Sequence, residues 1–436
     1  MLRPAVAAPD LTAPEIGTLL NAFEHAVEAA SPFNCIRLSP QDIGDAGALV
    51  IGAGKAAAAM AVAFNAAARD NVRGLVVTRY GHGLEAGEDA GEIEVLEAGH
   101  PAPDAASLGA AERALSLIDS LRPSEALWVL ISGGASALLA APLPGVTLEH
   151  KREAAECLMH AGADIREINA VRKHLSGIKG GRLAARAHPA RVNTLAISDV
   201  PGDGLADIGS GPTTPDPTTQ AQAIEILNRY GCPVDPVVRG VLTDPRNETP
   251  KPGDAAFAGD SAHIIANAAT ALDAAQRLLE SRGYRVTRLG NDLDDPAREL
   301  GAEHARLALA AAEEGGRHAF LSGGETRVVV TNTAARGGRN LEYLAALGQA
   351  LEGRAGVFAL AADTDGIDGN GDHAGGIVVP ELISRGRDHG SDLAQALAAN
   401  STYDYFDGCK LLIRTGPTRT NVNDFRLILV DTTAPE

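Results

Sequence analysis

Aromatic residues, methionine and cysteine are scarce in this sequence of 436 residues, which has 3% aromatic side chains, three methionines and four cysteines. So few aromatic side chains exclude a platform on which the bases of single-stranded nucleic acid stack. The cysteines form no C-x-x-C pair, so their spacing indicates neither a disulfide framework nor a zinc ribbon, and we expect a reducing, cytoplasmic location. They stand at Cys35, Cys157, Cys232 and Cys409.

Long apolar runs and an excess of positive charge are also lacking. No run approaches the roughly 18 apolar residues of a membrane-spanning helix, and residues 1–10 contain no apolar segment long enough for a signal peptide. The balance of 38 basic against 56 acidic residues gives a formal charge of −18, which opposes binding to a nucleic-acid backbone. We therefore expect no membrane or nucleic-acid partner, and any anionic ligand must be held by local basic residues or a metal ion.

What the chain does contain is a repeated alternation of apolar strand, glycine loop and helix. Such an alternation predicts a parallel sheet with helices on both faces and a ligand crevice beyond the carboxyl ends of the strands. The length predicts two or three domains, and the segment 233–252, rich in proline, aspartate and glycine, marks the expected boundary between residues 1–245 and 246–436. The second half repeats the same alternation.

Apolar runs and periodicity place the elements. The expected strands cover residues 73–78, 93–98, 126–131, 192–197, 284–289, 318–321 and 357–362, besides one that opens the stretch 49–68 and one after residue 424. The expected helices cover residues 11–30, 104–121, parts of 148–187, 263–281 and 296–314.

The stretch 49–62 is the first candidate site. Its apolar run ends at Gly52 and Gly54, and Lys55 falls in the first turn of the alanine-rich helix that follows. Unpaired N–H groups at the start of a helix favour a phosphate or carboxylate, and glycine lets a ligand approach the backbone. A cation at a helix start is disfavoured unless an anion binds beside it.

Two nucleotide-binding templates fit this stretch poorly. A P-loop requires Ser or Thr after the lysine, where Ala56 stands, so the stretch is not a Walker A site. Gly52-x-Gly54-x-x-Ala57 fits the looser dinucleotide pattern, which leaves an oxidoreductase open, although the following strand ends in Arg79 where that pattern has an acidic residue. A glycine turn needed only for packing is the remaining interpretation.

Carboxylates gather in the loop Asp363–Asp372, which has four within ten residues. Crowded carboxylates favour a cation between them, and magnesium suits such a site, whereas the spacing excludes an EF-hand. An exposed Asp-Gly turn is the alternative. Asp199 follows the buried strand at 192–197 and falls on the predicted crevice edge, where a turn cap is the competing interpretation.

Basic residues are concentrated between Arg166 and Arg186, which a solvated helix face would explain. Glycines interrupt this run, so Lys173 or Lys179 is also a candidate for binding an anion. Arg339 lies between paired glycines and an asparagine, and its planar guanidinium suits a carboxylate or a phosphoryl group. The sequence lacks the second glycine of a serine-hydrolase elbow after Ser136, and no H-E-x-x-H motif indicates catalytic zinc.

Taken together, these loops resemble the glycerate 2-kinases whose C-terminal part is the MOFRL domain, a family also named hydroxypyruvate reductase. The resemblance covers nearly the whole chain, and its many loops in one order make it specific. The matching segments are Gly52–Ala56, Ser132–Ser136, Asn169–Lys173, Ser176–Ala184, Ser198–Asp203, Gly209–Thr213, Ser322–Thr326, Gly337–Asn340, Ala362–Gly366 and Thr415–Thr418.

The resemblance implies an N-terminal Rossmann-like, doubly wound parallel sheet and a C-terminal α/β domain with the MOFRL region at about 316–430. It also implies transfer of the γ-phosphoryl group of ATP to the 2-hydroxyl of D-glycerate, with Mg²⁺, in an interdomain cleft. It allows a homodimer. Arg419 departs from the glycine expected in some relatives.

Site roles follow from the same resemblance. Lys55 and Arg339 would neutralise the transferring phosphoryl group and the glycerate carboxylate, and Asp365 would orient or deprotonate the hydroxyl, as phosphoryl transfer requires. Asp199, also counted as catalytic, and Asp363 would hold the metal. The residues implied for nucleotide or glycerate binding are Gly52, Gly54, Ser132, Gly133, Gly134, Ser136, Lys173, Ser322, Gly323, Gly324, Glu325 and Thr326.

Three functional hypotheses remain from the sequence. A kinase leads. An NAD(P)H-dependent hydroxypyruvate reductase is supported by the dinucleotide-like glycines but lacks a recognisable histidine and carboxylate pair as proton donor. A non-catalytic regulator that binds a sugar acid is third, because glycine loops on parallel sheets also serve binding modules.

Overall fold

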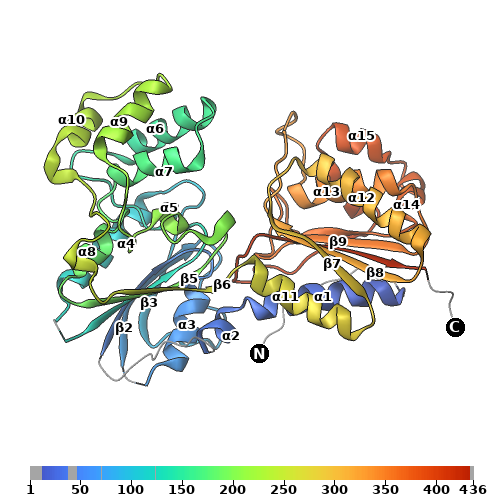
Figure 1. Cartoon of the computed structure of the whole chain (residues 1–436), viewed down its shortest axis with the longest axis horizontal. Coiled ribbons are helices and arrows are strands. Elements are labelled where there is room, and N and C mark those ends of the chain that lie inside the picture. Colours follow the sequence, from blue (N-terminus) through green and yellow to red (C-terminus); the bar gives the residue numbers. More distant parts are fainter. Residues whose placement is uncertain (1–11, 38–46, 70, 123, 433–436) are drawn as a thin grey trace. The chain divides into compact units, whose positions relative to one another are not determined.

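The computed structural model describes residues 12–37, 47–69, 71–122 and 124–432 (Figure 1). The chain forms two compact units, Cys35–Ile265 and the combination of Met1–Asn34 with Ala266–Glu436. The expected boundary after residue 245 differs from this division because β6 (Ser261–Ala266) joins the first sheet and helix α1 (Pro14–Ala29) packs in the second unit. Each unit is described by itself below.

The unit Cys35–Ile265 is built on a six-stranded sheet in the order β3-β2-β1-β4-β5-β6. The pairs of β1 with β2 and β4, of β2 with β3 and of β4 with β5 are parallel. This strand order is that of the Rossmann fold, in which the order reverses next to the first strand. The remaining strands are β1 (Ala48–Ala53), β2 (Val72–Arg79), β3 (Glu92–Ala98), β4 (Ala126–Ile131) and β5 (Arg191–Ile197).

Helices cover both faces of this sheet, as predicted. In Figure 1, α3 lies on one face, and α4, α5 and α8 lie on the other. Strand β1 is buried along its whole length because neighbouring strands flank it on both sides and helices pack above and below. The helices are α3 (Ala57–Ala67), α4 (Ala105–Asp119), α5 (Ala135–Leu138) and α8 (Arg182–Ala187), and α2 (Pro32–Arg37) spans the division between the units.

Four further helices of this unit form a cluster with its own apolar core beside the sheet (Figure 1). A disulfide joins Cys157 of one helix to Cys232, which the cysteine spacing did not indicate because their separation of 75 residues is bridged only by the fold. The helices are α6 (Leu148–His160), α7 (Ile165–His174), α9 (Gln220–Arg229) and α10 (Pro236–Thr243), of which the last two lie in segments where no helix was expected.

The second unit has a mixed sheet in the order β11-β10-β9-β12-β8-β7, so the expectation that its strands repeat the parallel pattern is wrong. Only β7 and β8 pair in parallel among its recorded pairs, since β12 lies antiparallel between β8 and β9. The strands are β7 (Arg285–Leu293), β8 (Arg317–Gly324), β9 (Val357–Asp363), β10 (Gly375–Val378), β11 (Leu412–Ile413) and β12 (Asp424–Asp431).

Helices again lie on both faces of this mixed sheet. Figure 1 shows α1 and α11 (Ala268–Ser281) on one face and α12 to α15 on the other. The ring centroids of Phe23 on α1 and Phe425 on β12 are 5.7 Å apart, which ties the N-terminal helix to the last strand. The other helices are α12 (Ala297–Glu314), α13 (Arg339–Leu351), α14 (Leu382–Asp388), α15 (Leu393–Ala398) and α16 (Thr402–Gly408).

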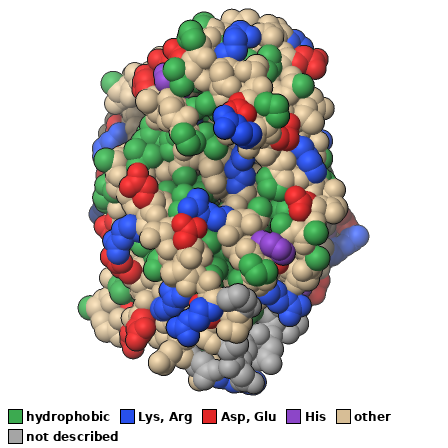
Figure 2. All heavy atoms as spheres, turned by 90° about the vertical axis from the view of Figure 1, so that its left-hand side faces the viewer, with side chains coloured by type: hydrophobic (Ala, Val, Ile, Leu, Met, Phe, Trp, Pro, Cys, Tyr) green, Lys and Arg blue, Asp and Glu red, His purple; other side chains and the backbone are tan. Residues whose placement is uncertain are grey.

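Every helix among the described residues is too short or too polar to span a bilayer. On the face of the molecule drawn in Figure 2, basic and acidic side chains alternate over the surface and do not gather into one basic patch.

Candidate active site

The loops after β1 and β4 meet at the point where the strand order of the first sheet reverses. The two strands pair directly, with Ala53 opposite Ile131 at their carboxyl ends. In a doubly wound sheet this switch point is where ligands bind. It brings together Gly52–Lys55 and Ser132–Ser136, two of the segments that the sequence indicated.

The backbone N–H groups of the loop after β1 donate hydrogen bonds to other residues of the same unit. The N–H of Gly54 donates to Val77 O at 3.0 Å, that of Lys55 to Gly133 O at 2.8 Å, and that of Ala56 to Ser132 Oγ at 3.0 Å. The N–H groups of Gly54, Lys55 and Ala56 therefore have acceptors within this unit, and binding of an anion at the start of the helix stays a prediction. Lys55 also precedes α3, whose first residue is Ala57, instead of standing in its first turn.

Glycine at positions 52 and 54 is required by close approach between strands. Gly54 has φ of 137°, and a Cβ atom there would lie 2.1 Å from Ser132 Oγ. A Cβ atom at Gly52 would lie 2.8 Å from Leu130 O. These glycines therefore hold the two loops together, as the packing interpretation predicted, and thereby place Lys55 beside the second loop.

The second loop offers the hydrogen-bond donors that the first does not. The structure records no acceptor for the N–H groups of Gly133 and Gly134 within the part of the chain it describes. A Cβ atom at Gly134 would lie 3.6 Å from Lys55 Cγ and 2.9 Å from His100 Cδ2, so both side chains border this loop. A half-buried ammonium beside two amide N–H groups can bind a phosphoryl or carboxylate oxygen.

The other candidates of this unit occupy different surroundings. Lys173 is 5% exposed, and its ammonium lies 3.4 Å from Asp216 Oδ1, so it has a buried ion-pair partner. Asp199 is half-buried just beyond β5, at the carboxyl edge of the sheet as expected. The Oγ atom of Ser136 accepts a hydrogen bond from Lys179, which the sequence named only as an alternative to Lys173.

Arg339 is the centre of the site in the second unit. Its guanidinium donates to Asp424 Oδ1 at 2.8 Å, to Glu325 Oε1 at 2.9 Å and to Asp363 Oδ2 at 2.6 Å. Burial opposes its charge, but the attraction of these carboxylates outweighs burial and raises the pKa of Arg339 above its ordinary value. The sequence identified Arg339, Glu325 and Asp363 but missed Asp424, which is paired only by tertiary folding.

The four carboxylates of the loop Asp363–Asp372 have different hydrogen-bond partners. Asp363 pairs with Arg339, Asp365 accepts the N–H of Ile367, and Asp368 accepts the N–H groups of Asn340 and Leu341 at the start of α13. Asp372 accepts hydrogen bonds from the Tyr403 hydroxyl and the Arg414 guanidinium. Asp363 and Asp368 both attract the charge of Arg339, which therefore takes the place expected for a cation, and the described residues contain no group of three potential metal ligands.

Asp363 does not fit a magnesium site in this arrangement. Its Oδ2 atom accepts from Arg339, and its Oδ1 atom accepts the N–H of Asp365 at 3.0 Å. The positive charge of Arg339 beside Oδ2 opposes the binding of a metal cation to this carboxylate. The exposed-turn interpretation is wrong for the first part of the loop, since Asp363 and Asp365 are each 2% exposed and Asp368 is fully buried, but Asp372 is exposed.

Residues 322–324 belong to strand β8 and not to a loop. Ser322, Gly323 and Gly324 pair with Arg426, Phe425 and Asp424 of β12, so their backbone takes part in the sheet. The loop begins at Glu325. Arg426, which the sequence did not indicate, donates to Gly323 O at 3.0 Å and to Asp424 Oδ2 at 3.1 Å, and so adds a second positive charge behind Asp424.

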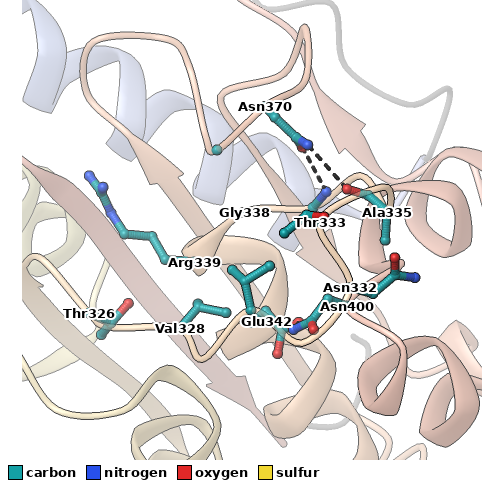
Figure 3. A pocket seen from close by; sticks show the side chains of 13 residues that line it. Thr326, Val328, Asn332, Thr333, Ala335, Gly338, Arg339, Glu342, Asn370 and Asn400 are labelled. Atoms are coloured by element: carbon teal, nitrogen blue, oxygen red, sulfur yellow. Dashed lines mark hydrogen bonds between the residues drawn. The ribbon is translucent and has the colours of Figure 1, made fainter. Parts of the chain in front are cut away.

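A pocket of about 390 Å³ opens beside Arg339 (Figure 3). Thr326 lines it, is 3% exposed, and has a hydroxyl without a recorded partner among the described residues. Asn370 lines another side, where its amide donates to Ala335 O at 3.1 Å and accepts from Gly337 N at 3.1 Å. A pocket of this size, lined by both polar and apolar side chains, is suited to a small ligand.

Arg419 lies near the end of the chain with φ of 63° and 7% exposure. A positive φ is a conformation that glycine adopts without steric cost. This geometry explains why glycine would suit the position, as the family resemblance suggested.

Comparison with known proteins identifies the family. One family model, described as a domain of unknown function (DUF4147), matches residues 18–243, and the MOFRL family model matches residues 318–424. A D-glycerate 2-kinase of Thermotoga maritima is 36% identical over 416 residues, covering 94% of this chain and 97% of that protein. The chain belongs to the MOFRL-domain glycerate kinase family. The resemblance drawn from the loops is confirmed.

Structural comparison agrees with this membership. The crystal structure of glycerate kinase from Thermotoga maritima matches with a TM-score of 0.86 and 36% identity, covering 95% of this chain and 99% of that chain. It confirms the two-domain α/β fold. A relative from Agrobacterium vitis, 44% identical over 94% of both chains, carries the name hydroxypyruvate reductase, so names within this glycerate kinase family describe two different reactions.

Proposed function

We propose that the protein transfers the γ-phosphoryl group of ATP to the 2-hydroxyl of D-glycerate, giving 2-phospho-D-glycerate and ADP. The observation that carries this proposal is the position of Lys55 beside the N–H groups of Gly133 and Gly134, which have no recorded acceptor among the described residues. The chain also shares 36% identity with a D-glycerate 2-kinase. Phosphoryl transfer depends on positioning and charge stabilisation, which such a group of donors supplies.

The roles of the individual side chains follow from their surroundings. Lys55 would neutralise charge on the transferring phosphoryl group, together with the Gly133 and Gly134 N–H groups. Arg339 uses three of its five N–H donors on carboxylates, so two remain for a substrate carboxylate or phosphoryl oxygen. Asp365 would orient the attacking hydroxyl and accept its proton.

Hydroxypyruvate reduction is the second candidate function, and the loop after β1 argues against it. A dinucleotide site needs the backbone N–H groups of that loop for the pyrophosphate. Here the N–H groups of Gly54 and Lys55 already donate to Val77 and Gly133. The dinucleotide-like glycines instead serve the close contact with the loop after β4.

Magnesium and a homodimer are parts of this proposal that rest on the family resemblance. The cytoplasmic location rests on the cysteine spacing alone, and the Cys157–Cys232 disulfide argues against it. Of the two carboxylates that the resemblance implies for the metal, we favour Asp199, because Asp363 is paired with the cationic Arg339. Activity after treatment with EDTA and after adding back Mg²⁺ tests the metal requirement. Light scattering at increasing ionic strength tests the dimer.

Two parallel assays decide between the candidate functions. The purified protein is incubated with D-glycerate and Mg-ATP, and separately with hydroxypyruvate and NADH or NADPH. Glycerate-dependent formation of ADP supports the kinase, and phosphorus NMR of the product distinguishes 2-phosphoglycerate from 3-phosphoglycerate. Oxidation of the nicotinamide without ADP formation would replace the kinase by a reductase, whereas silence in both assays would favour a binding protein.

A further inference from the structure

A group of three basic side chains in the first unit has no acidic partner. Lys151 on α6, Arg172 on α7 and Lys179 just before α8 form no ion pair with any described carboxylate. The segments that carry them lie together, because α6 packs on α7 and Ser210 Oγ bonds both Asn169 of α7 and the Ser136 hydroxyl beside Lys179. Lys151 and Arg172 accordingly repel the charge of Lys179. In a chain of net charge −18, such an uncompensated group of cations indicates a place for an anion.

Lys179 forms the buried centre of this group. It is 3% exposed, and its ammonium donates to Ser136 Oγ at 2.8 Å and to the carbonyl oxygens of Ser136 and Gly209 at 3.2 Å each. All three acceptors are neutral. Ser136 Oγ also lies 2.8 Å from Ser210 Oγ, so the loop after β4 and the Gly209 loop meet at this ammonium.

Lys151 and Arg172 supply the donors that a ligand would use. Both are half-buried, and no described side chain or carbonyl accepts a hydrogen bond from their side-chain nitrogens. An ammonium and a guanidinium together carry eight N–H donors. Asp207, a carboxylate close to this network, accepts a hydrogen bond from the side-chain amide of Asn169 at 3.2 Å.

The positive charges of the two lysines are destabilised in this arrangement. Burial, and then repulsion by Arg172, lower the pKa of Lys151 to about 8. Burial, and then repulsion by Lys151 and Arg172, hold the pKa of Lys179 well below its ordinary value. A phosphate placed among them would reverse this effect, because an opposite charge favours the protonated form of a lysine.

We propose that Lys151, Arg172 and Lys179 form a subsite that binds a phosphate group, supplied by the nucleotide of the proposed reaction. Lys151 and Arg172 contact the phosphate oxygens, and Lys179 fixes the two loops and adds its charge. The phosphorylated product is the other source of the same chemistry. This inference rests on the proposed function for the identity of the ligand, but the basic group itself does not.

Calorimetric titration of the full-length protein tests the subsite with ADP, 2-phosphoglycerate and inorganic phosphate as separate probes. The variants are K151Q and R172Q, and the control is R166Q, which removes an exposed arginine from the same helix as Arg172. We expect K151Q and R172Q each to weaken ADP binding by about tenfold or more, with R166Q close to wild type. Melting temperatures check that the variants fold, and R172K serves as a second, charge-preserving variant with a smaller loss than R172Q.

The outcomes distinguish the nucleotide from the phosphorylated product as the source of the bound phosphate group. Weakened ADP binding assigns the subsite to the nucleotide, and weakened binding of 2-phosphoglycerate alone assigns it to the product. Unchanged binding of both ligands overturns the proposal, as does an equal loss in R166Q, which would indicate diffuse charge. Because these titrations need no turnover, a protein that fails to phosphorylate glycerate would end the proposed function without deciding the subsite.

Discussion

The side chain of Arg339 donates its Nε–H to Oδ1 of Asp424 over 2.8 Å, although 85 residues separate the two in the chain. Asp424 is 2% exposed, and its carboxylate also accepts hydrogen bonds from the side-chain amide of Asn340 at 2.8 Å and from the guanidinium of Arg426 at 3.1 Å. Its carboxylate thus determines where the Arg339 guanidinium lies. Removal of one member of such a buried pair leaves the other uncompensated.

Asp424→Asn tests this dependence. We expect the free energy of unfolding to fall by about 3 kcal/mol, because the variant leaves the positive charges of Arg339 and Arg426 without this partner. We also expect kcat to fall more than KM rises, since Arg339 loses its position. Denaturant unfolding and steady-state kinetics measure the two effects. Asp294→Asn, at a pair more than two-thirds exposed, should change stability by less than about 0.5 kcal/mol.

Lys55→Ala tests the group of donors at the switch point. Turnover should fall about a hundredfold or more, because a preorganised charge at the reacting phosphoryl group is lost. The melting temperature should stay near that of wild type, since Lys55 is only half-buried. Arg122→Ala, at a position 78% exposed, is the control and should keep full turnover. Turnover of Lys55→Ala equal to wild type would remove Lys55 from the mechanism.

Gly54→Ala tests the contact between the loops after β1 and β4. The added Cβ atom would meet Ser132 Oγ at 2.1 Å in a conformation with φ of 137°, so we expect destabilisation by more than about 2 kcal/mol and loss of activity. Gly109 lies inside α4 with open space around it, and Gly109→Ala should instead stabilise by about 0.5–1 kcal/mol. Equal effects in the two variants would contradict the packing argument.

His304 makes the stability depend on pH. Burial, and then the charge of Arg426, lower the pKa of His304 to about 4 from its ordinary 6.5. Between these values the unfolded chain binds a proton that the folded protein does not, so stability falls as the pH decreases from 6.5 to 4, by up to about 3 kcal/mol.

Denaturant unfolding across this pH range measures the effect. His304→Asn should reduce the slope of stability against pH, whereas His160→Asn, at an exposed position, should retain it. A slope that His304→Asn leaves unchanged would contradict the assignment. The absolute stability of His304→Asn is also expected to fall, because the hydrogen bond between Nδ1 and the Tyr343 hydroxyl at 2.9 Å is lost.

Sequence patterns predicted strands β1 to β5 of the first sheet because parallel strands buried on both faces form continuous apolar runs that glycine loops end. Strand β6 was missed, since the expected helix at 263–281 overlaps it. Strand β4 was predicted with its bounds at Ala126 and Ile131. The same patterns failed for the second sheet. A buried strand such as β12 has an apolar run of the same kind whether it pairs in parallel or antiparallel, so its insertion between β8 and β9 was not foreseeable.

Candidate site residues were predictable where a local motif marks them, as for Lys55 and Arg339. Their partners were not. Nothing near Asp424 in the sequence shows that it will meet Arg339, and the spacing of Asp363 and Asp368 suggested one metal site although each accepts a different donor. Lys173 and Lys179 looked equivalent until folding placed Asp216 beside the first and only neutral oxygens beside the second.

Helix α1 belongs to the same unit as β12, where Phe23 meets Phe425. A ribosome therefore completes the whole of Cys35–Ile265 before the strands that receive α1 exist. Domains fold as units during synthesis, so the Rossmann-like unit can fold before the second unit is complete. During that time Phe23 and the other apolar residues of α1 have no sheet to pack against. Nascent chains of this enzyme therefore expose the apolar residues of the α1 segment for most of their translation.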